Sequence, residues 1–485
     1  MRLAAHGPFD VIVDESVAPN ERAGVFVDSF FHLRPGGTYL VRAFRAGARQ
    51  REDVRLPVAR MVRRLTEGRP VRAPRQGVSV SAADACSFGD AFDEVSFGRW
   101  HLRVTNKTHA LAKMREEQVD ALFRERPARG EVVARVPAAR LRSRSVVRHN
   151  LPEDSDWPTV YTAPELALRS YVDAVCAPYQ GVFQGNVVLP DSYRHNQKAR
   201  LVNGPATQEV TRLFARPKAE LGDVLDLPGT FFHLDNEHRG HFGHVLTEMV
   251  SRLWAFEHAR RAYPDLRVLV GQNHGRDLQR FEREIFEAAG IDVPVTVVDR
   301  PVRVERLLSA TPMLSHPAYV HPGIAAVWAG IGRALEARST RDDLPTRVFC
   351  SRRVPSRMCL NAGEVEGLAR DHGFTVMWPE DLPFVDQVAM FRRAEVVAGY
   401  GGSALFTACF VDRPLPLVAV TSQAYTPRNE YMIASVLGHP LTWVAGPTEV
   451  PEPPPTPSVR LWALPFRLDL EKEGTLLVDT LRELG

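Results

Sequence analysis

Cysteine is scarce in this chain of 485 residues, and its charges almost cancel. The five cysteines are scattered, odd in number and never spaced as a CxxC pair. This pattern indicates a reducing compartment and argues against a thiolate zinc site. The formal net charge of +3 gives no overall attraction to nucleic acid. We therefore expect no nucleic-acid partner, and any site for an anion must be local.

Long apolar runs are missing as well. No stretch approaches the ~18 uninterrupted apolar residues of a membrane-spanning helix, and the opening "MRLAAHGPFD" has no apolar leader. We therefore expect a cytoplasmic protein, for which peripheral association with the inner face of a membrane stays open. The hydrophobic and charged fractions, 44% and 25%, are those of ordinary globular proteins, and the length predicts two or three domains.

The N-terminal block predicts a strand, a helix, a turn and a second strand, the strands being "FDVIVD" at 9–14 and "LRPGGTYLVRAF" at 33–44. Asp14 and the Pro35-Gly36-Gly37 turn resemble the second half of a class I methyltransferase. The glycine-rich loop that would hold the methyl donor has no counterpart upstream. We expect a degenerate or truncated module that does not transfer methyl groups.

The next stretch is harder to organise. We predict a helix over residues 110–123, followed by the arginine-rich run "ARLRSRSVVRHN" at 139–150, which we interpret as an exposed basic connector. Such charge runs are usually solvated faces. Binding to an acidic acceptor or an anionic lipid surface is the alternative.

From residue 266 onward, strands and helices alternate in two series that meet near residue 340. Strands that alternate with helices of this length predict parallel sheets, and two series predict two Rossmann-like halves with a cleft between them. The proline-rich stretch 450–457 should be extended, because proline lacks the N–H and fixes φ. A last helix is expected over 472–484. The predicted strands are 266–271, 293–299, 346–351, 374–378, 394–400 and 416–420, and the predicted helices are 276–289, 322–337 and those starting at Asn361, Phe384 and Ser403.

The first candidate site is the loop after the strand 346–351. Arg352, Arg353 and Arg357 follow this strand, and Asn361 begins the next helix as its N-cap, with Glu364 three residues later. Ligands of doubly wound sheets bind beyond the carboxyl ends of the strands, where helix N-termini point free N–H groups. Arginines there could hold a diphosphate. Arginines that only keep the surface soluble are the alternative.

The second candidate is "AGYGGSALF" at 398–406, again a strand, a turn and a helix. Gly401 and Gly402 would let a ligand approach the backbone, and Ser403 could cap the helix and offer a hydroxyl. A glycine turn is also what any tight strand-to-helix connection needs. The turn at 401–403 is a candidate site because it is expected at the same sheet edge as the arginine loop.

The third candidate is "HLDNEHRGHFGHVLTEMVSRLW" at 233–254. His241, His244, Glu248 and Arg252 are spaced by three or four residues and would share one helix face. Histidine oriented by a carboxylate can act as a general base near neutral pH. A metal site is the weaker interpretation, because HxxH is poor spacing on one helix and no third ligand is fixed. A structural histidine in the core is the remaining alternative.

The segment "RVFCSRRVPSRMCLNAGEVEGLARDHGFTVMWPEDLPFVDQVAMFRRAEVVAGYGGSALFTACF" (347–410) resembles the C-terminal half of glycosyltransferase family 61, formerly DUF563. "GHFGHVLTEMVSRLW" is similar to the family's histidine-containing segment and aligns His244 with its histidine. Two departures are Gly401, where the family usually has histidine, and Ala362, where it often has glutamate. The residues that carry the resemblance are Arg352, Arg357, Asn361, Glu364, Gly373, Phe374, Pro379, Glu380, Phe384, Gln387, Gly399, Gly402, Leu405 and Phe410.

This resemblance implies a GT-B pair of Rossmann-like domains, a nucleotide-sugar donor held mainly by the C-terminal half, and inversion at the anomeric carbon. The donor site would consist of Arg352, Arg357, Asn361, Gln387 and the turn Gly401, Gly402 and Ser403. His244 or Glu248 would activate the acceptor hydroxyl. No cofactor and no metal are expected, and neither the sugar nor the oligomeric state is indicated.

The expected domains are a degenerate methyltransferase-like module over 1–125, a basic connector over 126–160, an acceptor domain over 161–340 and a donor domain over 341–485. Relatives of this kind suggest a role in surface polysaccharide or glycoconjugate biosynthesis. The alternative is a non-catalytic binding or scaffold protein built from degenerate transferase folds.

Overall fold

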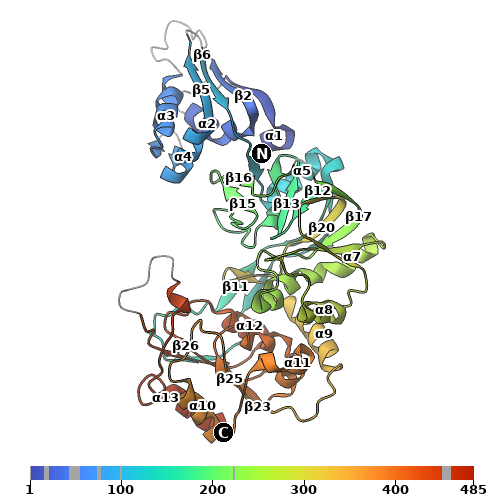
Figure 1. Ribbon diagram of the computed structural model, residues 1–485, viewed down its shortest axis with the longest axis vertical. Helices are drawn as coiled ribbons and strands as arrows, with labels where there is room; N and C mark the ends of the chain where they lie inside the picture. Colours follow the sequence, from blue (N-terminus) through green and yellow to red (C-terminus); the bar gives the residue numbers. More distant parts are fainter. Residues whose placement is uncertain are drawn as a thin grey trace. The chain divides into compact units, whose positions relative to one another are not determined.

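The computed structural model describes residues 2–15, 21–42, 55–73, 78–98, 101–221, 224–450 and 460–484 (Figure 1). The chain forms a mixed α/β structure of two compact units. Unit 1 comprises Met1–Val132, Arg169–Phe231 and Val298–Ser309; unit 2 comprises Val133–Leu168, Phe232–Val297 and Ala310–Gly485.

Unit 1 begins with a four-stranded sheet in the order β1-β2-β6-β5. Figure 1 shows α2, α3 and α4 on one side of the sheet. Phe26, Phe30, Tyr39 and Phe88 are fully buried beneath them, which explains how so small a sheet holds a core. The elements are α1 (Arg2–His6), β1 (Phe9–Asp14), α2 (Arg22–Ser29), β2 (Leu33–Arg42), α3 (Leu56–Thr66), β3 (Val71–Ala73), β4 (Val78–Val80), α4 (Ala82–Ala91), β5 (Phe92–Phe97) and β6 (His101–Asn106).

The predicted order of strand, helix and strand is confirmed here, and β1 pairs with β2 in parallel. The Pro35-Gly36-Gly37 segment is not a turn between elements, however, because it lies inside β2. Gly36 has φ +78°, and the β1 register shifts between Phe9 and Val11, so the strand absorbs an irregularity at this point. The resemblance of this module to a methyltransferase stays a prediction.

The predicted helix over 110–123 is wrong in its first half. Residues Leu111–Lys113 form a short strand, β7, in which all three residues are buried, and the helix α5 begins only at Glu116. The remaining elements of unit 1 are mostly strands. They are β8 (Gly130–Val136), β12 (Leu166–Ala177), β13 (Gly181–Gln184), β14 (Val187–Val188), β15 (Thr207–Glu209), β16 (Phe214–Pro217), β17 (Leu225–His233) and β20 (Val302–Ala310).

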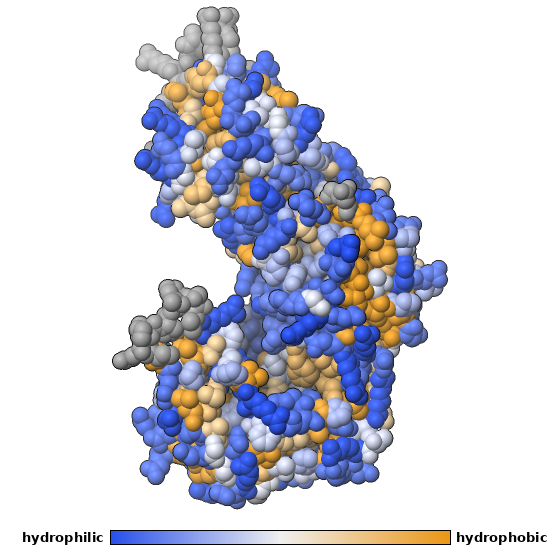
Figure 2. Space-filling view, viewed as in Figure 1, coloured by the Kyte–Doolittle hydropathy of each residue, from blue (hydrophilic) through white to orange (hydrophobic). Residues whose placement is uncertain are grey.

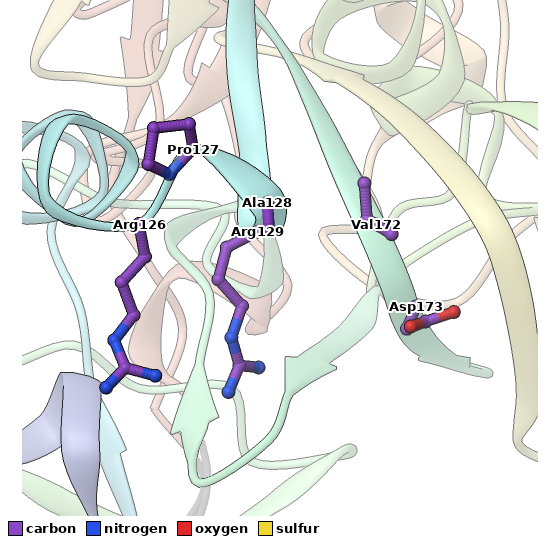
Figure 3. A pocket seen from close by; sticks show the side chains of 6 residues that line it. All are labelled: Arg126, Pro127, Ala128, Arg129, Val172 and Asp173. Atoms are coloured by element: carbon purple, nitrogen blue, oxygen red, sulfur yellow. The ribbon is translucent and has the colours of Figure 1, made fainter.

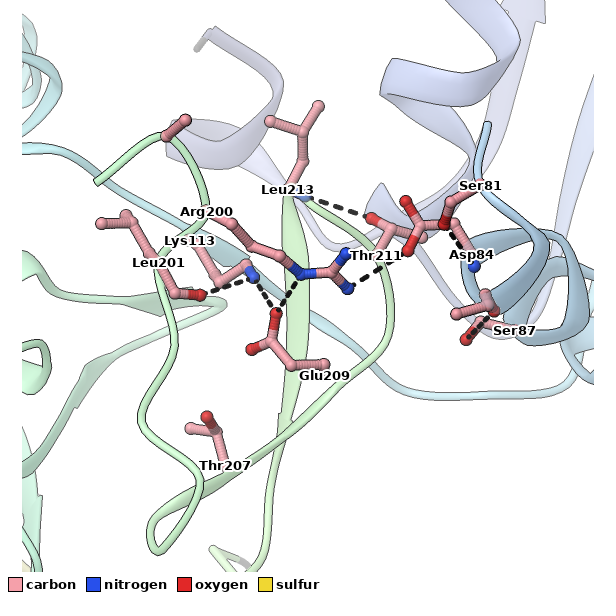
Figure 4. Close-up of polar contacts among 12 residues, drawn as sticks. Ser81, Asp84, Ser87, Lys113, Arg200, Leu201, Thr207, Glu209, Thr211 and Leu213 are labelled. Atoms are coloured by element: carbon pink, nitrogen blue, oxygen red, sulfur yellow. Dashed lines mark hydrogen bonds and ion pairs between the residues drawn. The ribbon is translucent and has the colours of Figure 1, made fainter. Parts of the chain in front are cut away.

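Lys113 is the hub of a polar network that joins β7, β15 and α4 within unit 1 (Figure 4). Its ammonium donates to the Leu201 carbonyl at 2.9 Å and to Glu209 Oε2 at 2.6 Å. Arg200 contacts the same carboxylate at 3.3 Å and also Asp84 Oδ1 at 3.3 Å. Burial lowers the pKa of Lys113, and the Glu209 carboxylate opposes that effect. The charge of Lys113 in this buried strand is therefore paired with a carboxylate. The sequence pattern does not reveal that partner.

Unit 2 contains a parallel six-stranded sheet in the order β10-β27-β26-β25-β23-β24. The predicted alternation of strands and helices is confirmed throughout this region. The C-terminal helix packs back on the sheet, since Leu477 and Leu481 share one buried cluster with Phe349 and Val418. The elements are β23 (Arg347–Cys350), α10 (Ala362–Asp371), β24 (Thr375–Met377), α11 (Phe384–Arg393), β25 (Val396–Tyr400), η8 (Leu405–Phe410), β26 (Leu417–Ser422), α12 (Asn429–Leu437), β27 (Leu441–Gly446) and α13 (Thr475–Leu484).

Helix α9 packs against both the sheet region and the histidine-containing segment of unit 2. Its Trp328 indole N–H donates to the Leu246 carbonyl at 2.9 Å, and a Cβ at Gly332 would overlap the Phe410 carbonyl oxygen. Close helix packing therefore requires glycine at this position. The elements that complete unit 2 are α7 (Phe256–Ala262), β18 (Arg267–Gly271), α8 (Arg280–Ala288), β19 (Val295–Val298), β21 (Leu314–Ser315), β22 (Tyr319–Val320) and α9 (Ile324–Glu336).

The arginine-rich stretch 139–150 is exposed at its arginines, as expected, but it contains two short strands. It forms β9 (Ala139–Arg142), which pairs with β11 (Val160–Ala163), and β10 (Val147–His149), which is the parallel edge strand beside β27. Arginines alternate with Leu141 and Val147 in these strands, so one face can pack while the guanidinium groups reach solvent. The domain limits proposed from the sequence stay a prediction.

The face seen in Figure 2 is largely hydrophilic, with apolar residues gathered in patches on it. Among the helices that the structure describes, none has the length and apolarity needed to span a bilayer. The proline-rich stretch 450–457 lies outside the described residues, apart from Val450.

Asn150 fixes the edge strand β10 and gives the first prediction. Its side chain donates to the carbonyls of Ala445 and Glu473 at 3.0 and 2.8 Å and accepts from the Ala445 N–H at 2.8 Å. Replacing Asn150 by Ala should lower the free energy of unfolding by about 2–3 kcal/mol, because two carbonyls and one N–H lose their partner. Urea denaturation of the full chain measures this change.

Asp154 supplies the control, since it is exposed in the same segment. Asp154→Ala should stay within about 0.5 kcal/mol of the original protein. Equal effects of the two substitutions would contradict the anchoring role of Asn150.

Candidate functional site

The arginine loop follows β23, and the glycine turn follows its neighbour β25, so both lie at the carboxyl edge of the parallel sheet of unit 2. The backbone of the arginine loop is tied to the C-terminal segment. Arg357 N donates to the Ala463 carbonyl at 2.9 Å, and Phe466 N donates to the Met358 carbonyl at 3.0 Å. These bonds hold the loop in one conformation at this edge.

Arg352 and Arg357 converge on Gly402. A Cβ placed on Gly402 would overlap Arg352 Nη2 and lie 2.8 Å from Arg357 Nη2. Gly402 also has φ +139°, a conformation that side-chain-bearing residues rarely adopt. Glycine is therefore required here both by its backbone and by the two guanidinium groups above it.

Among the described residues, neither of these two arginines forms a direct ion pair. Arg352 donates to the carbonyls of Ser356 and Gly401 at 2.9 and 3.0 Å. Within the described ranges, neither Arg352 nor Arg357 has an acidic side chain within ion-pair distance. Burial, followed by the nearby charge of Arg357, lowers the pKa of Arg352 to about 10. Two partly buried cations held side by side make this a place that favours an anion.

Arg357 is held by aromatic rings. Its guanidinium lies 4.8 Å from the centroid of Tyr425 and 5.3 Å from that of Trp462. Its φ is +57°, unusual for a residue with a side chain, and its Nε is buried with no hydrogen-bond partner among the described residues. Such backbone strain concentrates at functional sites. Trp462 and Tyr425 were not predicted from the sequence, because they come from segments far from the arginine loop.

Arg353 points away from this group. It forms an ion pair with Asp381, stacks 4.8 Å from the ring centroid of Trp378, and keeps its side chain 53% exposed. Arg353 is therefore a surface residue, whereas Arg352 and Arg357 belong to the candidate site.

Glu430 supports the glycine turn from below, and sequence reasoning missed it. The Gly402 N–H donates to Glu430 Oε1 at 2.6 Å, and the Tyr425 hydroxyl lies 3.4 Å from the same oxygen. The residue is 1% exposed, and burial raises its pKa to about 7. A signal was present, since Glu430 lies in α12 just beyond the carboxyl end of β26, the next strand of the same edge.

The histidine-containing segment is not a regular α-helix. It consists of α6 (Phe242–His244), the π-helical turn η5 (Val245–Met249) and the 3₁₀ turn η6 (Val250–Ala255). The expected single face is therefore wrong for Arg252, which is buried and donates to the Ala310 carbonyl at 3.1 Å. The π-helical turn and the 3₁₀ turn after it change the angle per residue, so Arg252 no longer shares a face with His244 and Glu248.

His244 and Glu248 do meet. Their Nδ1 and Oε2 atoms lie 3.2 Å apart, and Asn236 Nδ2 lies 3.3 Å from the same oxygen. The ring centroids of His238 and His241 are 4.7 and 4.8 Å from that of His244. This is the geometry of an imidazole oriented by a carboxylate.

The histidine cluster adjoins the glycine turn inside unit 2. A Cβ on Gly243 would lie 2.7 Å from Ser403 Oγ and 2.9 Å from Phe406 Cε2. The pKa of His241 is lowered by burial, by His244 and by the charge of Arg357. The structure therefore brings together His244, Glu248, Arg352, Arg357 and the turn Gly401, Gly402 and Ser403.

Two of the predicted donor residues form hydrogen bonds within the protein. Asn361 precedes α10, but its side chain bonds Glu364 Oε2 at 2.9 Å and the Leu468 carbonyl at 2.8 Å rather than capping the helix. Gln387 donates to the Leu382 carbonyl at 3.0 Å. The helix expected from Ser403 is a 3₁₀ helix that starts at Leu405. Among the described residues, no group of three or more His, Cys, Asp or Glu side chains could hold a metal ion.

An open pocket of about 530 Å³ lies elsewhere, in unit 1 (Figure 3). Arg126 and Arg129 extend their guanidinium groups in the same direction along it, and Asp173 lies on the neighbouring strand. None of its lining residues is among those predicted for the site.

The family model described as Glycosyltransferase 61 matches residues 242–418. This range contains the histidine segment, the arginine loop and the glycine turn. No curated protein matches the chain.

Two solved structures of TibC are similar to the chain, weakly. The first is the dodecameric iron-containing heptosyltransferase TibC in complex with ADP-D-beta-D-heptose, with 11% identity, 56% of this chain and 67% of that chain covered, and a TM-score of 0.24. The second is TibC from enterotoxigenic E. coli H10407, with 11% identity, 54% and 77% covered, and a TM-score of 0.24.

The requirement for glycine at position 402 can be measured. Gly402→Ala should lower the free energy of unfolding by about 1–3 kcal/mol, because the new methyl group meets both guanidinium groups and the backbone becomes strained. Gly367→Ala is the matched control, since Gly367 lies in α10 with open space around its Cβ position. That substitution should raise stability by about 0.5–1 kcal/mol. Two changes of the same sign would contradict the close approach at Gly402.

Proposed function

We propose that the chain is an inverting glycosyltransferase that moves a sugar from a nucleotide-sugar donor to a hydroxyl acceptor. One observation carries the proposal: Arg352 and Arg357 converge on Gly402, and neither has an ion-pair partner in the described part of the chain. The match of residues 242–418 to Glycosyltransferase 61 supports it. A GT-B arrangement, the four domains expected from the sequence, a cytoplasmic location and a role in surface polysaccharide or glycoconjugate biosynthesis are parts of the same proposal.

Arg352 and Arg357 would hold the diphosphate of the donor. As the bond between the anomeric carbon and the phosphate oxygen breaks, negative charge grows on the departing nucleoside diphosphate. Guanidinium groups that already point at this place stabilise that charge without reorganising. The Gly401–Gly402 backbone lets the phosphates approach closely, and Ser403 adds a hydroxyl.

His244 would act as the general base. Glu248 orients the ring through Nδ1, and the imidazole would take the proton of the acceptor hydroxyl. The acceptor oxygen then attacks the anomeric carbon opposite the leaving phosphate, so the new bond forms with inversion. Glu248 acts through His244, as a positioning residue.

The two neighbouring arginines provide a matched test of the donor site. Arg352→Ala should lower sugar transfer about 100-fold or more, because it removes one of two groups that stabilise the leaving diphosphate. Arg353→Ala should leave transfer near the original rate, since Arg353 is exposed and paired with Asp381. Release of nucleoside diphosphate from a panel of UDP-, GDP-, ADP- and dTDP-sugars gives the rates.

A thermal-shift series with the free nucleoside diphosphates completes this test, because a ligand of the folded state raises the melting temperature. We expect a rise for at least one of them, which Arg352→Ala abolishes. No rise with any of the four, together with no release from their sugars, would overturn the enzyme and favour a non-catalytic scaffold.

The base is tested separately. His244→Ala should lower kcat by about 10²–10⁴-fold, while nucleoside diphosphate still raises the melting temperature because the arginine loop is unchanged. Glu248→Gln should lower kcat and leave the nucleoside diphosphate thermal shift unchanged, since the imidazole loses the carboxylate that orients it. An unaltered kcat in His244→Ala would exclude this residue as the base.

A further inference from the structure

The carboxyl group of Glu430 lies directly beneath the site and takes no part in the mechanism above. Its Oε1 accepts the short bond from the Gly402 N–H, 2.6 Å long. Its Oε2 is buried and has no hydrogen-bond partner among the described residues. A buried carboxylate with one unsatisfied oxygen is costly, whereas the neutral acid is not penalised in this way.

Four elements face this carboxyl group. The loop after β23 contributes the charges of Arg352 and Arg357, and the loop after β26 contributes the Tyr425 hydroxyl. The turn after β25 contributes only the Gly402 N–H. On α12 itself, the N-cap Arg428 is turned to Trp157, 4.1 Å from its ring centroid. The two loop arginines are therefore the charges that favour the ionised form.

These influences nearly balance in the empty site. Burial favours the neutral acid and raises the pKa of Glu430 to about 7, while the Gly402 N–H and the Arg357 charge lower it. Both protonation states are thus populated near neutral pH. Anything that cancels the charge of the arginines shifts this balance toward the neutral acid.

We propose that Glu430 is a positioning residue that takes up a proton when a nucleoside diphosphate binds to Arg352 and Arg357, so that the diphosphate and the proton enter the site together. The inference rests on the proposed function, because it concerns the same anion site. The bound phosphates neutralise the arginines and repel the carboxylate. The protonated acid still offers a carbonyl oxygen to the Gly402 N–H, so the turn keeps its position under the ligand.

Other groups could also take up protons when the ligand binds, and the choice of pH distinguishes them from Glu430. An unperturbed imidazole has a pKa of about 6.5, and burial lowers the pKa of His241 from that value. A terminal phosphate has its second pKa at about 6 and is fully ionised at pH 8. Arg352 and Tyr425 do not change protonation at pH 8, since the first stays charged and burial raises the pKa of the second far above this range. Uptake at pH 8 therefore reports on Glu430.

Isothermal titration calorimetry with the full chain tests this at pH 8. The ligand is the nucleoside diphosphate that gives the largest thermal shift, titrated in buffers of different ionisation enthalpy. We expect the original protein to take up about half a proton per bound diphosphate, and its Kd to rise about fivefold between pH 7 and pH 9. Glu430→Gln keeps an oxygen for the Gly402 N–H but cannot titrate. It should bind with no proton uptake at pH 8 and with a Kd that does not change over this range.

Glu471→Gln is the control, because Glu471 is an exposed glutamate of the same unit, and it should take up protons as the original protein does. Binding without proton uptake in the original protein would overturn the inference alone, even if Glu430→Gln fails to fold. Uptake that persists in Glu430→Gln would assign the proton to another group and overturn it as well. No binding of any nucleoside diphosphate would overturn the proposed function and the inference with it.

Discussion

Two guanidinium groups of like charge meet above a residue that has no side chain, and the site of unit 2 depends on this arrangement. Arg352 and Arg357 occupy the space where a Cβ of residue 402 would lie. Hydrogen bonds to backbone carbonyls hold Arg352 in position despite this repulsion. The rings of Tyr425 and Trp462 hold Arg357, and the buried Glu430 accepts a hydrogen bond from the Gly402 N–H of the turn. A bound anion would relieve the repulsion between the two guanidinium groups. The free energy released in this way would add to the binding free energy of the anion.

The parts that hold this arrangement come from distant segments of the chain. The C-terminal segment binds the backbone of the arginine loop through Ala463 and Phe466, and Asn361 adds a further link to Leu468. Asn361 is thus better understood as an anchor of the loop than as a donor contact. The Gly243 backbone lies close to Ser403, and this contact brings the neighbouring residue, His244, near the glycine turn. The family match begins at Phe242 and ends at 418, so it includes His244, Arg352 and Asn361 and leaves out Glu430 and Trp462.

Errors of the sequence-based prediction occurred where local pattern and tertiary environment disagree. The helix expected from Ala110 has a helical spacing of apolar residues, yet Leu111–Lys113 form a buried strand, because Lys113 finds a carboxylate in Glu209. The arginines of 139–150 indicated solvent, yet β10 completes a sheet by pairing with β27. Arg252 does not share the predicted helix face with His244 and Glu248, because a π-helical turn interrupts the segment. The spacing of residues in the sequence does not predict such a turn.

The sequence by itself determined the alternation of strands and helices in unit 2, because burial on a sheet or on a helix imposes periods of two and 3.6 residues that are written locally. It also placed the arginine loop and the glycine turn at one sheet edge, since parallel strands share the direction of their carboxyl ends. Only the tertiary structure decided that Arg353 faces solvent while Arg352 and Arg357 converge, and that Glu430 supports them. Those outcomes depend on side chains that lie between 28 residues away, as Asp381 does from Arg353, and 105 residues away, as Trp462 does from Arg357. Contacts over such separations produce no periodic pattern in the sequence.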